Sequence, residues 1–113
     1  MIYLCTQRKE FWRNNFYEYI NLEDAIELLK PLSEIANDTE TTGLSCHTKQ
    51  LLLIQLGNDD IQILFDIESY QFKIPKLLKE FMNSYNGIWI LQNAKFDLQF
   101  YYKQGVILKK VYD

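Results

Sequence analysis

Apolar and polar residues follow one another along the chain in two kinds of pattern, one typical of strands and one typical of helices. Short runs rich in apolar and β-branched residues predict strands, bounded by polar or glycine-containing turns. We place these strands at residues 1–5, 16–20, 34–40, 51–56, 61–67 and 88–91. The run at 51–56 is almost continuously apolar, so we expect it to be buried on both faces.

Three segments instead repeat apolar side chains at helical spacing. Asn21 suits the N-cap of the first helix and Pro31 marks its end, while Pro75 suits the first position of the second. Gly105 closes the third helix. The predicted helices cover residues 22–29, 75–85 and 94–104.

The order of these elements predicts the fold class. Three consecutive strands, at 34–40, 51–56 and 61–67, favour an antiparallel meander, and a helix, a strand and a helix then follow. A helical crossover that returns to the sheet gives a mixed α/β architecture. Residues 8–15 are predicted to form a turn, with Phe11 and Trp12 packing inward.

Composition limits the class of protein. A chain of 113 residues with 48% hydrophobic and 15% aromatic residues is expected to form one globular domain. We find neither a run of about 20 apolar residues, as a membrane helix requires, nor a signal-peptide pattern. Cys5 and Cys46 are too few for a disulfide framework, so a reduced, cytoplasmic setting is expected. The net charge of −3 argues against broad binding to duplex nucleic acid.

Two carboxylates mark the end of the strand at 34–40. Asp38 and Glu40 would point to one face of that strand, with Thr39 on the other. Adjacent carboxylates repel unless they are protonated or bridged by a cation, and hard cations such as Mg²⁺ or Mn²⁺ prefer oxygen ligands. The alternative is an ordinary strand end that runs into a polar turn, where Asp, Thr and Gly are common.

Two motifs add a family resemblance. Residues 38–44 (Asp-Thr-Glu-Thr-Thr-Gly-Leu) resemble the first motif of the DEDD 3′–5′ exonucleases, and residues 93–98 (Asn-Ala-Lys-Phe-Asp-Leu) resemble the second. Their order and separation also fit. The resemblance is nearest to the proofreading domains of family A, DNA polymerase I-like polymerases, with RNase D-type enzymes next. It implies a ribonuclease H-like fold, with residues 1–33 as a lead-in and residues 34–113 as the first part of the exonuclease domain.

The resemblance also implies an activity and a site. Asp38, Glu40 and Asp97 would be catalytic and would hold two divalent metal ions, Mg²⁺ or Mn²⁺. Asp97 is expected to face the other two carboxylates. The reaction would hydrolyse the 3′-terminal phosphodiester of single-stranded DNA and release a nucleoside monophosphate, as part of a larger polymerase chain. An RNase D-like RNA exonuclease and a non-catalytic nucleic-acid-binding module stay open as alternatives.

Further residues would contact the substrate. By resemblance, Leu44 would wedge against the terminal base, Thr41 would lie near the terminal 3′-OH, and Asn93 would bond the substrate backbone. Phe96 and Tyr101 are candidates to stack on a base, although core packing is the stronger expectation for Phe96.

The sequence departs from the family pattern at two points. Asn37 stands where an apolar residue is usual, and a buried amide without partners costs about 1–3 kcal/mol. The third motif, Tyr-x-x-x-Asp, does not occur in these 113 residues. We therefore expect the chain to end inside the domain, to hydrolyse DNA very poorly by itself, and to self-associate through apolar surface exposed near residues 88–91.

Overall fold

A computed structural model describes residues 1–12, 16–43 and 45–113. The described chain folds around one mixed sheet, in the strand order β2-β1-β5-β4-β3-β6-β7. The strands are β1 (Ile2–Cys5), β2 (Glu18–Tyr19), β3 (Glu34–Thr41), β4 (Leu51–Gly57), β5 (Gln62–Asp66), β6 (Ile88–Ile90) and β7 (Val111–Tyr112). The α-helices are α1 (Leu22–Leu29), α2 (Lys76–Ser84) and α3 (Ala94–Lys103), and short 3₁₀ helices cover Lys9–Phe11 and Ile67–Tyr70.

The topology confirms the predicted α/β class. Strands β3, β4 and β5 form an antiparallel meander, and β6 returns after α2 to pair with β3 in parallel. Strand β1 pairs with β5 in parallel on the other side of the meander. The observed helix boundaries also agree closely with the predicted ones. For example, Asn21 caps α1 by accepting a hydrogen bond from the backbone N–H of Asp24. Pro75 is the N-cap of α2 rather than its first residue.

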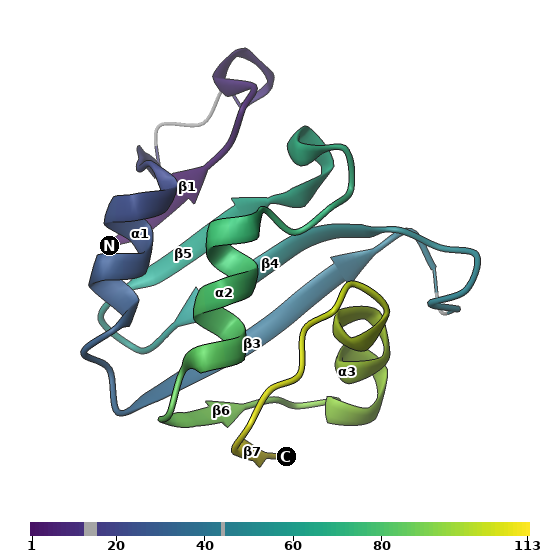
Figure 1. Cartoon of the computed structure of the whole chain (residues 1–113). Helices are drawn as coiled ribbons and strands as arrows, with labels where there is room; N and C mark the ends of the chain where they lie inside the picture. The colour runs from purple at the N-terminus through teal and green to yellow at the C-terminus, as the bar shows by residue number, and fades with distance from the viewer. Residues whose placement is uncertain (13–15, 44) are drawn as a thin grey trace.

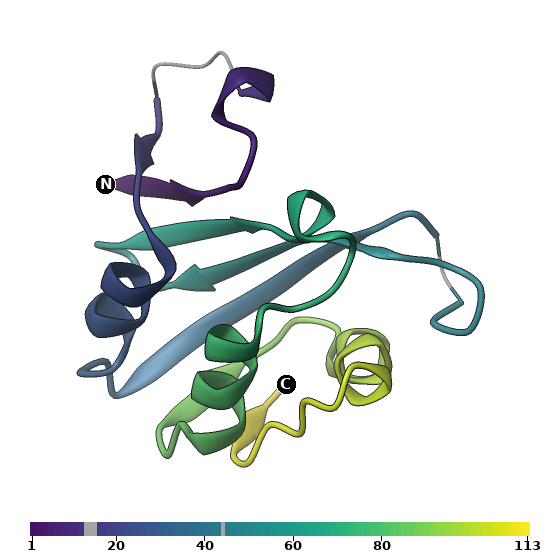
Figure 2. The same cartoon turned by 45° about the horizontal axis from the view of Figure 1, so that its top comes forward.

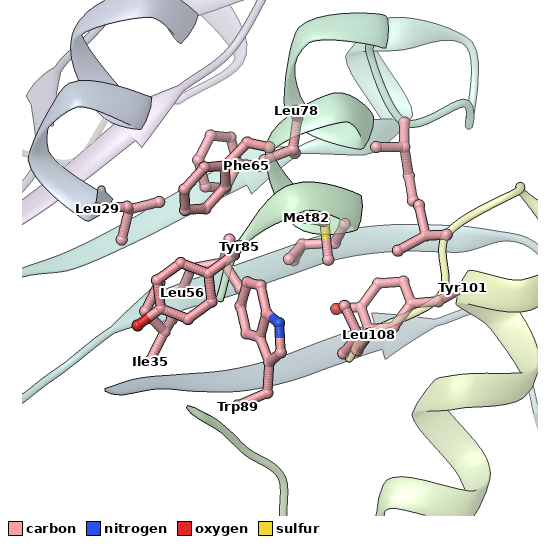
Figure 3. Packing of buried hydrophobic residues seen from close by; sticks show 14 of the residues in the cluster. Leu29, Ile35, Leu56, Phe65, Leu78, Met82, Tyr85, Trp89, Tyr101 and Leu108 are labelled. Atoms are coloured by element: carbon pink, nitrogen blue, oxygen red, sulfur yellow. The ribbon is translucent and has the colours of Figure 1, made fainter. Parts of the chain in front are cut away.

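In the described part of the chain, the helices α1, α2 and α3 cover the same face of the sheet (Figures 1 and 2). The core lies between this face and the helices, and Figure 3 shows how its large side chains interdigitate. The ring of Trp89 on β6 is fully buried against the rings of Phe81 and Tyr85 at the end of α2. In the described part of the chain, no helix has the length and apolar character needed to cross a membrane.

The opposite face of the sheet explains why one prediction was wrong. Strand β4 was expected to be buried on both faces, but Leu53 and Gln55 are only half-buried. They pair with Glu40 and Asp38 of β3, which are exposed, and so share the face that the helices do not cover. Alternate residues of the run at 51–56 therefore lie on the uncovered face, which an almost continuously apolar sequence does not reveal.

A buried carboxylate joins the N-terminal segment to the sheet. Asp66, the last residue of β5, is 1% exposed and accepts hydrogen bonds from Arg8, Thr6 and Trp12, with 2.9 Å from Arg8 Nε, 2.8 Å from Thr6 Oγ1 and 3.0 Å from Trp12 Nε1. Trp12 thus packs inward as predicted. Phe11 does not, because it is 62% exposed beneath the guanidinium of Arg8.

Candidate active site

The alternation of β3 separates two sets of side chains. Asp38 and Glu40 are exposed on the uncovered face of the sheet, whereas Asn37 and Thr39 turn toward the helices. This is the arrangement that the two-residue period of a strand predicts. The backbone N–H of Thr39 donates to Asp38 Oδ1 at 2.9 Å, which orients that carboxylate beside its own strand.

The third carboxylate approaches β3 from the other side. Asp97 lies in the first turn of α3, is 4% exposed, and accepts a hydrogen bond of 2.5 Å from the hydroxyl of Thr39. It therefore contacts the residue between Asp38 and Glu40 rather than facing the pair directly. Within the described residues, the structure contains no group of three His, Cys, Asp or Glu side chains placed to hold one metal ion.

The electrostatics of Asp97 reflect its position. Burial raises the pKa of its carboxyl, and the negative charges of Asp38 and Asp113 raise it further, while the hydrogen bond from Thr39 opposes the shift. The net pKa is above the ordinary value for Asp. Asp38 and Asp97 thus repel each other through the strand, a situation that a nearby cation would relieve.

A second polar contact docks α3 on β3. Tyr101, one turn beyond Asp97 on α3, is fully buried and donates its hydroxyl hydrogen to Oδ1 of Asn37. Tyr101 therefore cannot stack on a base, which overturns that expectation. The unusual Asn37 has a partner for its oxygen, while its Nδ2 has none among the described residues. The sequence contains a pattern that is consistent with both contacts. Asn37 and Thr39 are two residues apart on a strand and Asp97 and Tyr101 are four residues apart on a helix, so the members of each pair lie on one face.

The candidate substrate-binding residues differ from one another in exposure and in their contacts. The hydroxyl of Thr41 donates to the backbone oxygen of Gly43 at 2.7 Å, and Asn93 is exposed at the N-cap of α3. Phe96 is half-buried, with its ring tilted against Phe100 at 5.2 Å, as the core-packing alternative predicts. Leu44 lies outside the described residues.

The uncovered face next to Asp38 is hollowed. A cavity of about 260 Å³ borders Asp38, and its lining includes Gln55, Gln62, Gln92 and Ile90. The amides offer both donors and acceptors to a polar ligand. The chemistry of the donor set also fits a hard divalent cation, because Asp38 and Glu40 present adjacent carboxylates and Asp97 lies within electrostatic reach.

Comparison with known proteins identifies the family. A family model described as 3′–5′ exonuclease matches residues 14–113. The chain belongs to this 3′–5′ exonuclease family. It is 29% identical over 101 residues to DNA polymerase I of Aquifex aeolicus (strain VF5), an alignment that covers 86% of the chain and 16% of that polymerase.

Solved structures show that the fold is the ribonuclease H-like exonuclease fold. The structure of Brucella melitensis NrnC with bound Mg²⁺ has a TM-score of 0.66 and 22% identity, covering 99% of this chain and 49% of NrnC. Trypanosoma brucei RNase D, in complex with the RNA U12, has a TM-score of 0.68 and 19% identity, covering 99% and 37%. The chain thus spans less than half of the length of each of these two proteins.

Proposed function

We propose that this chain forms the metal-binding part of a 3′–5′ exonuclease domain that removes nucleotides from the 3′ end of single-stranded DNA. The observation that carries the proposal is the pair Asp38 and Glu40, which lies side by side on an exposed strand face within a chain of this family. The proposed products are nucleoside monophosphates, and the proposed context is proofreading within a longer polymerase.

The proposed cofactors are two divalent cations, Mg²⁺ or Mn²⁺. Asp38 and Glu40 would hold them on the uncovered face, with Asp97 contributing from α3. When bound, such cations activate a water molecule and stabilise the leaving oxygen in phosphodiester hydrolysis. The solved structure of NrnC with bound Mg²⁺ supports this choice of metal. In this chain, Thr39 would orient Asp97 through the hydrogen bond between them.

Single-stranded DNA is favoured over RNA by the kind of similarity found. The curated relative matched by sequence is a DNA polymerase, whereas RNase D shares the fold at below 25% identity. Asn93 would bind the strand through its side-chain amide, for which the structure shows no capping bond to α3. Thr41, Leu44 and Phe96 would complete the contacts to the terminal nucleotide. RNA hydrolysis is the second candidate, since the RNase D structure contains RNA.

The metal site predicts a measurable difference between two variants. Isothermal titration with Mn²⁺ should show binding to the native chain and much weaker binding to Asp38→Ala, because one of the two adjacent carboxylates is lost. Asp59→Ala serves as the matched control, since Asp59 is also an exposed aspartate but lies in the turn between β4 and β5. Equal Mn²⁺ binding by native and Asp38→Ala chains would contradict the site.

The exonuclease activity of the 113-residue chain is expected to be very low. Asp97 is hydrogen-bonded to Thr39 rather than to the pair Asp38 and Glu40, and the sequence contains no Tyr-x-x-x-Asp motif to supply a fourth carboxylate and a group that positions the water. The measurement is release of mononucleotides from 3′-labelled dT₁₂ and U₁₂ with Mn²⁺ present. We expect slow release that favours dT₁₂ and that Asp38→Ala abolishes.

Two outcomes would correct this proposal. Fast release that depends on Asp38 would show that three carboxylates suffice for catalysis. Preference for U₁₂ over dT₁₂ would support the RNA exonuclease instead.

A further inference from the structure

A second cavity lies on the face of the sheet that the helices cover. Its volume is about 530 Å³, and its walls come from the loop after β3, the segment before α2, α2 itself and the end of α3. Four lysines from these separate parts of the chain line it: Lys49, Lys73, Lys79 and Lys103. The family motifs contribute none of these residues.

The charge at this cavity is unbalanced. None of the four lysines forms a salt bridge within the described residues, where the lysines that do so are Lys30 and Lys76. No Asp or Glu of the described chain lines the cavity either. The protein has a net charge of −3, so a local group of four cations without acidic partners is a strong departure from its overall balance. Like charges gathered in this way favour binding of an anion.

The wall that carries Lys73 is held in place by Gln104. The Oε1 atom of Gln104 accepts from the backbone N–H of Ile74 at 2.7 Å, and its Nε2 donates to the backbone oxygen of Phe72 at 3.0 Å. The side chain of Gln104 thus forms hydrogen bonds with the backbone on both sides of Lys73. Gln71 and Phe72 just before it have φ values of 61° and 62°, which are strained for residues other than glycine.

The opposite wall is also tied to α3. Lys103 Nζ donates to the backbone oxygen of His47 at 3.2 Å, which links the last turn of α3 to the loop that follows β3. That loop begins at the end of the strand that carries Asp38 and Glu40. The cavity is therefore connected to the candidate active site by one loop and one helix, because α3 carries Asp97 in its first turn and Lys103 in its last.

An apolar hollow adjoins the basic cavity. It has a volume of about 600 Å³ and shares Cys46, His47 and Lys103 with the cavity. Leu98 and Tyr102 also line it, and Tyr102 is 73% exposed. A basic groove beside an exposed aromatic ring is the combination that binds single-stranded nucleic acids, because the lysines contact phosphates and the ring stacks on a base. Free phosphate or an acidic peptide would need no such ring.

We propose that the basic cavity and the adjoining hollow form an accessory site for single-stranded nucleic acid, outside the family motifs. Phosphates contact Lys49, Lys73, Lys79 and Lys103, and a base stacks on Tyr102. The choice of ligand rests on the proposed function, since a nuclease must hold the strand whose 3′ end it shortens. The site itself rests on its charge and geometry.

The test measures binding without hydrolysis. Anisotropy of fluorescein-labelled dT₁₂ in EDTA is compared for the native chain, the pair Lys73→Gln/Lys103→Gln and the control pair Lys109→Gln/Lys110→Gln. The control lysines are exposed and line neither cavity. We expect the first pair to lower affinity about tenfold and to reduce the salt slope by about 1.4, since each single-strand phosphate contact contributes about 0.7. The control pair should change little.

The aromatic part has its own matched comparison. Tyr102→Ala should weaken dT₁₂ binding several-fold, whereas Tyr112→Ala should not, although Tyr112 is 70% exposed. Equal loss in both lysine pairs would show an effect of net charge only and would overturn the site. Displacement of dT₁₂ by inorganic phosphate at equal phosphate concentration would overturn the assignment to a strand. Far-ultraviolet circular dichroism confirms that every variant is folded.

This experiment is independent of the catalytic proposal. Binding is measured in EDTA, which removes divalent cations from the candidate active site, and neither Asp38 nor Glu40 lines either cavity. Loss of strand binding only in the lysine pair, together with equal Mn²⁺ binding by the native and Asp38→Ala chains, would refute the proposed metal site while supporting the accessory site. Equal dT₁₂ binding by the native chain and the lysine pair, together with Mn²⁺ binding that depends on Asp38, would refute the accessory site and leave the proposed function intact.

Discussion

Replacing Asp66 by Asn is expected to destabilise the protein by about 1–3 kcal/mol, because three half-buried donors lose the buried, charged acceptor that they share. The carboxylate is 1% exposed and takes hydrogen bonds from Arg8, Thr6 and Trp12. The Asn side chain would turn an NH₂ group toward some of these donors. Chemical denaturation with urea, followed by tryptophan fluorescence, measures the change in the free energy of unfolding.

The same contact offers a matched control. Arg8 also pairs with Glu68 at 3.0 Å, but the side chain of Glu68 is 40% exposed. Glu68→Gln should therefore change stability by less than about 1 kcal/mol, as exposed ion pairs do. Similar effects of Asp66→Asn and Glu68→Gln would contradict the view that burial makes Asp66 important.

The pH dependence of this difference follows from the pKa of Asp66. Burial raises that pKa, but hydrogen bonds from Arg8, Trp12 and Thr6 outweigh the effect, so the folded pKa lies below the ordinary value. A lowered folded pKa stabilises the protein above the unfolded pKa of about 3.9, and this stabilisation is lost as pH falls through the folded value. The stability gap between native and Asp66→Asn should thus be full at neutral pH and shrink below about pH 4.

Asn37→Val is expected to destabilise the protein by about 1–3 kcal/mol, since it removes the acceptor of a buried hydroxyl. Sequence reasoning favours the opposite sign, because Val has the higher strand propensity and Asn is costly when buried without partners. The structure decides the question, since the hydroxyl of the fully buried Tyr101 donates to Oδ1 of Asn37. Urea denaturation measures the effect as a change in the transition midpoint, provided that the dependence of the free energy of unfolding on urea concentration is the same for both proteins.

A double-mutant cycle separates the pair from its surroundings. Tyr101→Phe should also destabilise, because it removes the donor to Oδ1 of the buried Asn37 side chain. The combination Asn37→Val/Tyr101→Phe should be less destabilising than the sum of the two, by about 0.5–3 kcal/mol of coupling. It also removes Nδ2 of Asn37, which has no partner in the described part of the chain. Strict additivity would show that the hydrogen bond contributes nothing to stability.

The sequence by itself determined the order and type of most elements. Helical spacing from residue 22 to 29, with Asn21 as N-cap, and the three apolar runs from residue 34 onward correspond to α1 and to the meander β3-β4-β5. These features are local, so the identity of each residue and of its neighbours was sufficient to predict them. The two motifs similarly indicated the family that residues 14–113 match.

Only the tertiary structure decided which side chains meet. A two-residue period places Asp38 and Glu40 on one strand face, but it does not say which face the helices cover. The docking of α3 brings Asp97 to Thr39 and Tyr101 to Asn37, while Gln104 grips the chain beside Lys73. Contacts of this kind join residues 32 to 64 positions apart, where no local pattern operates. They arise from the packing of the helices on one face of the sheet, which is why the basic cavity could not be predicted from the sequence.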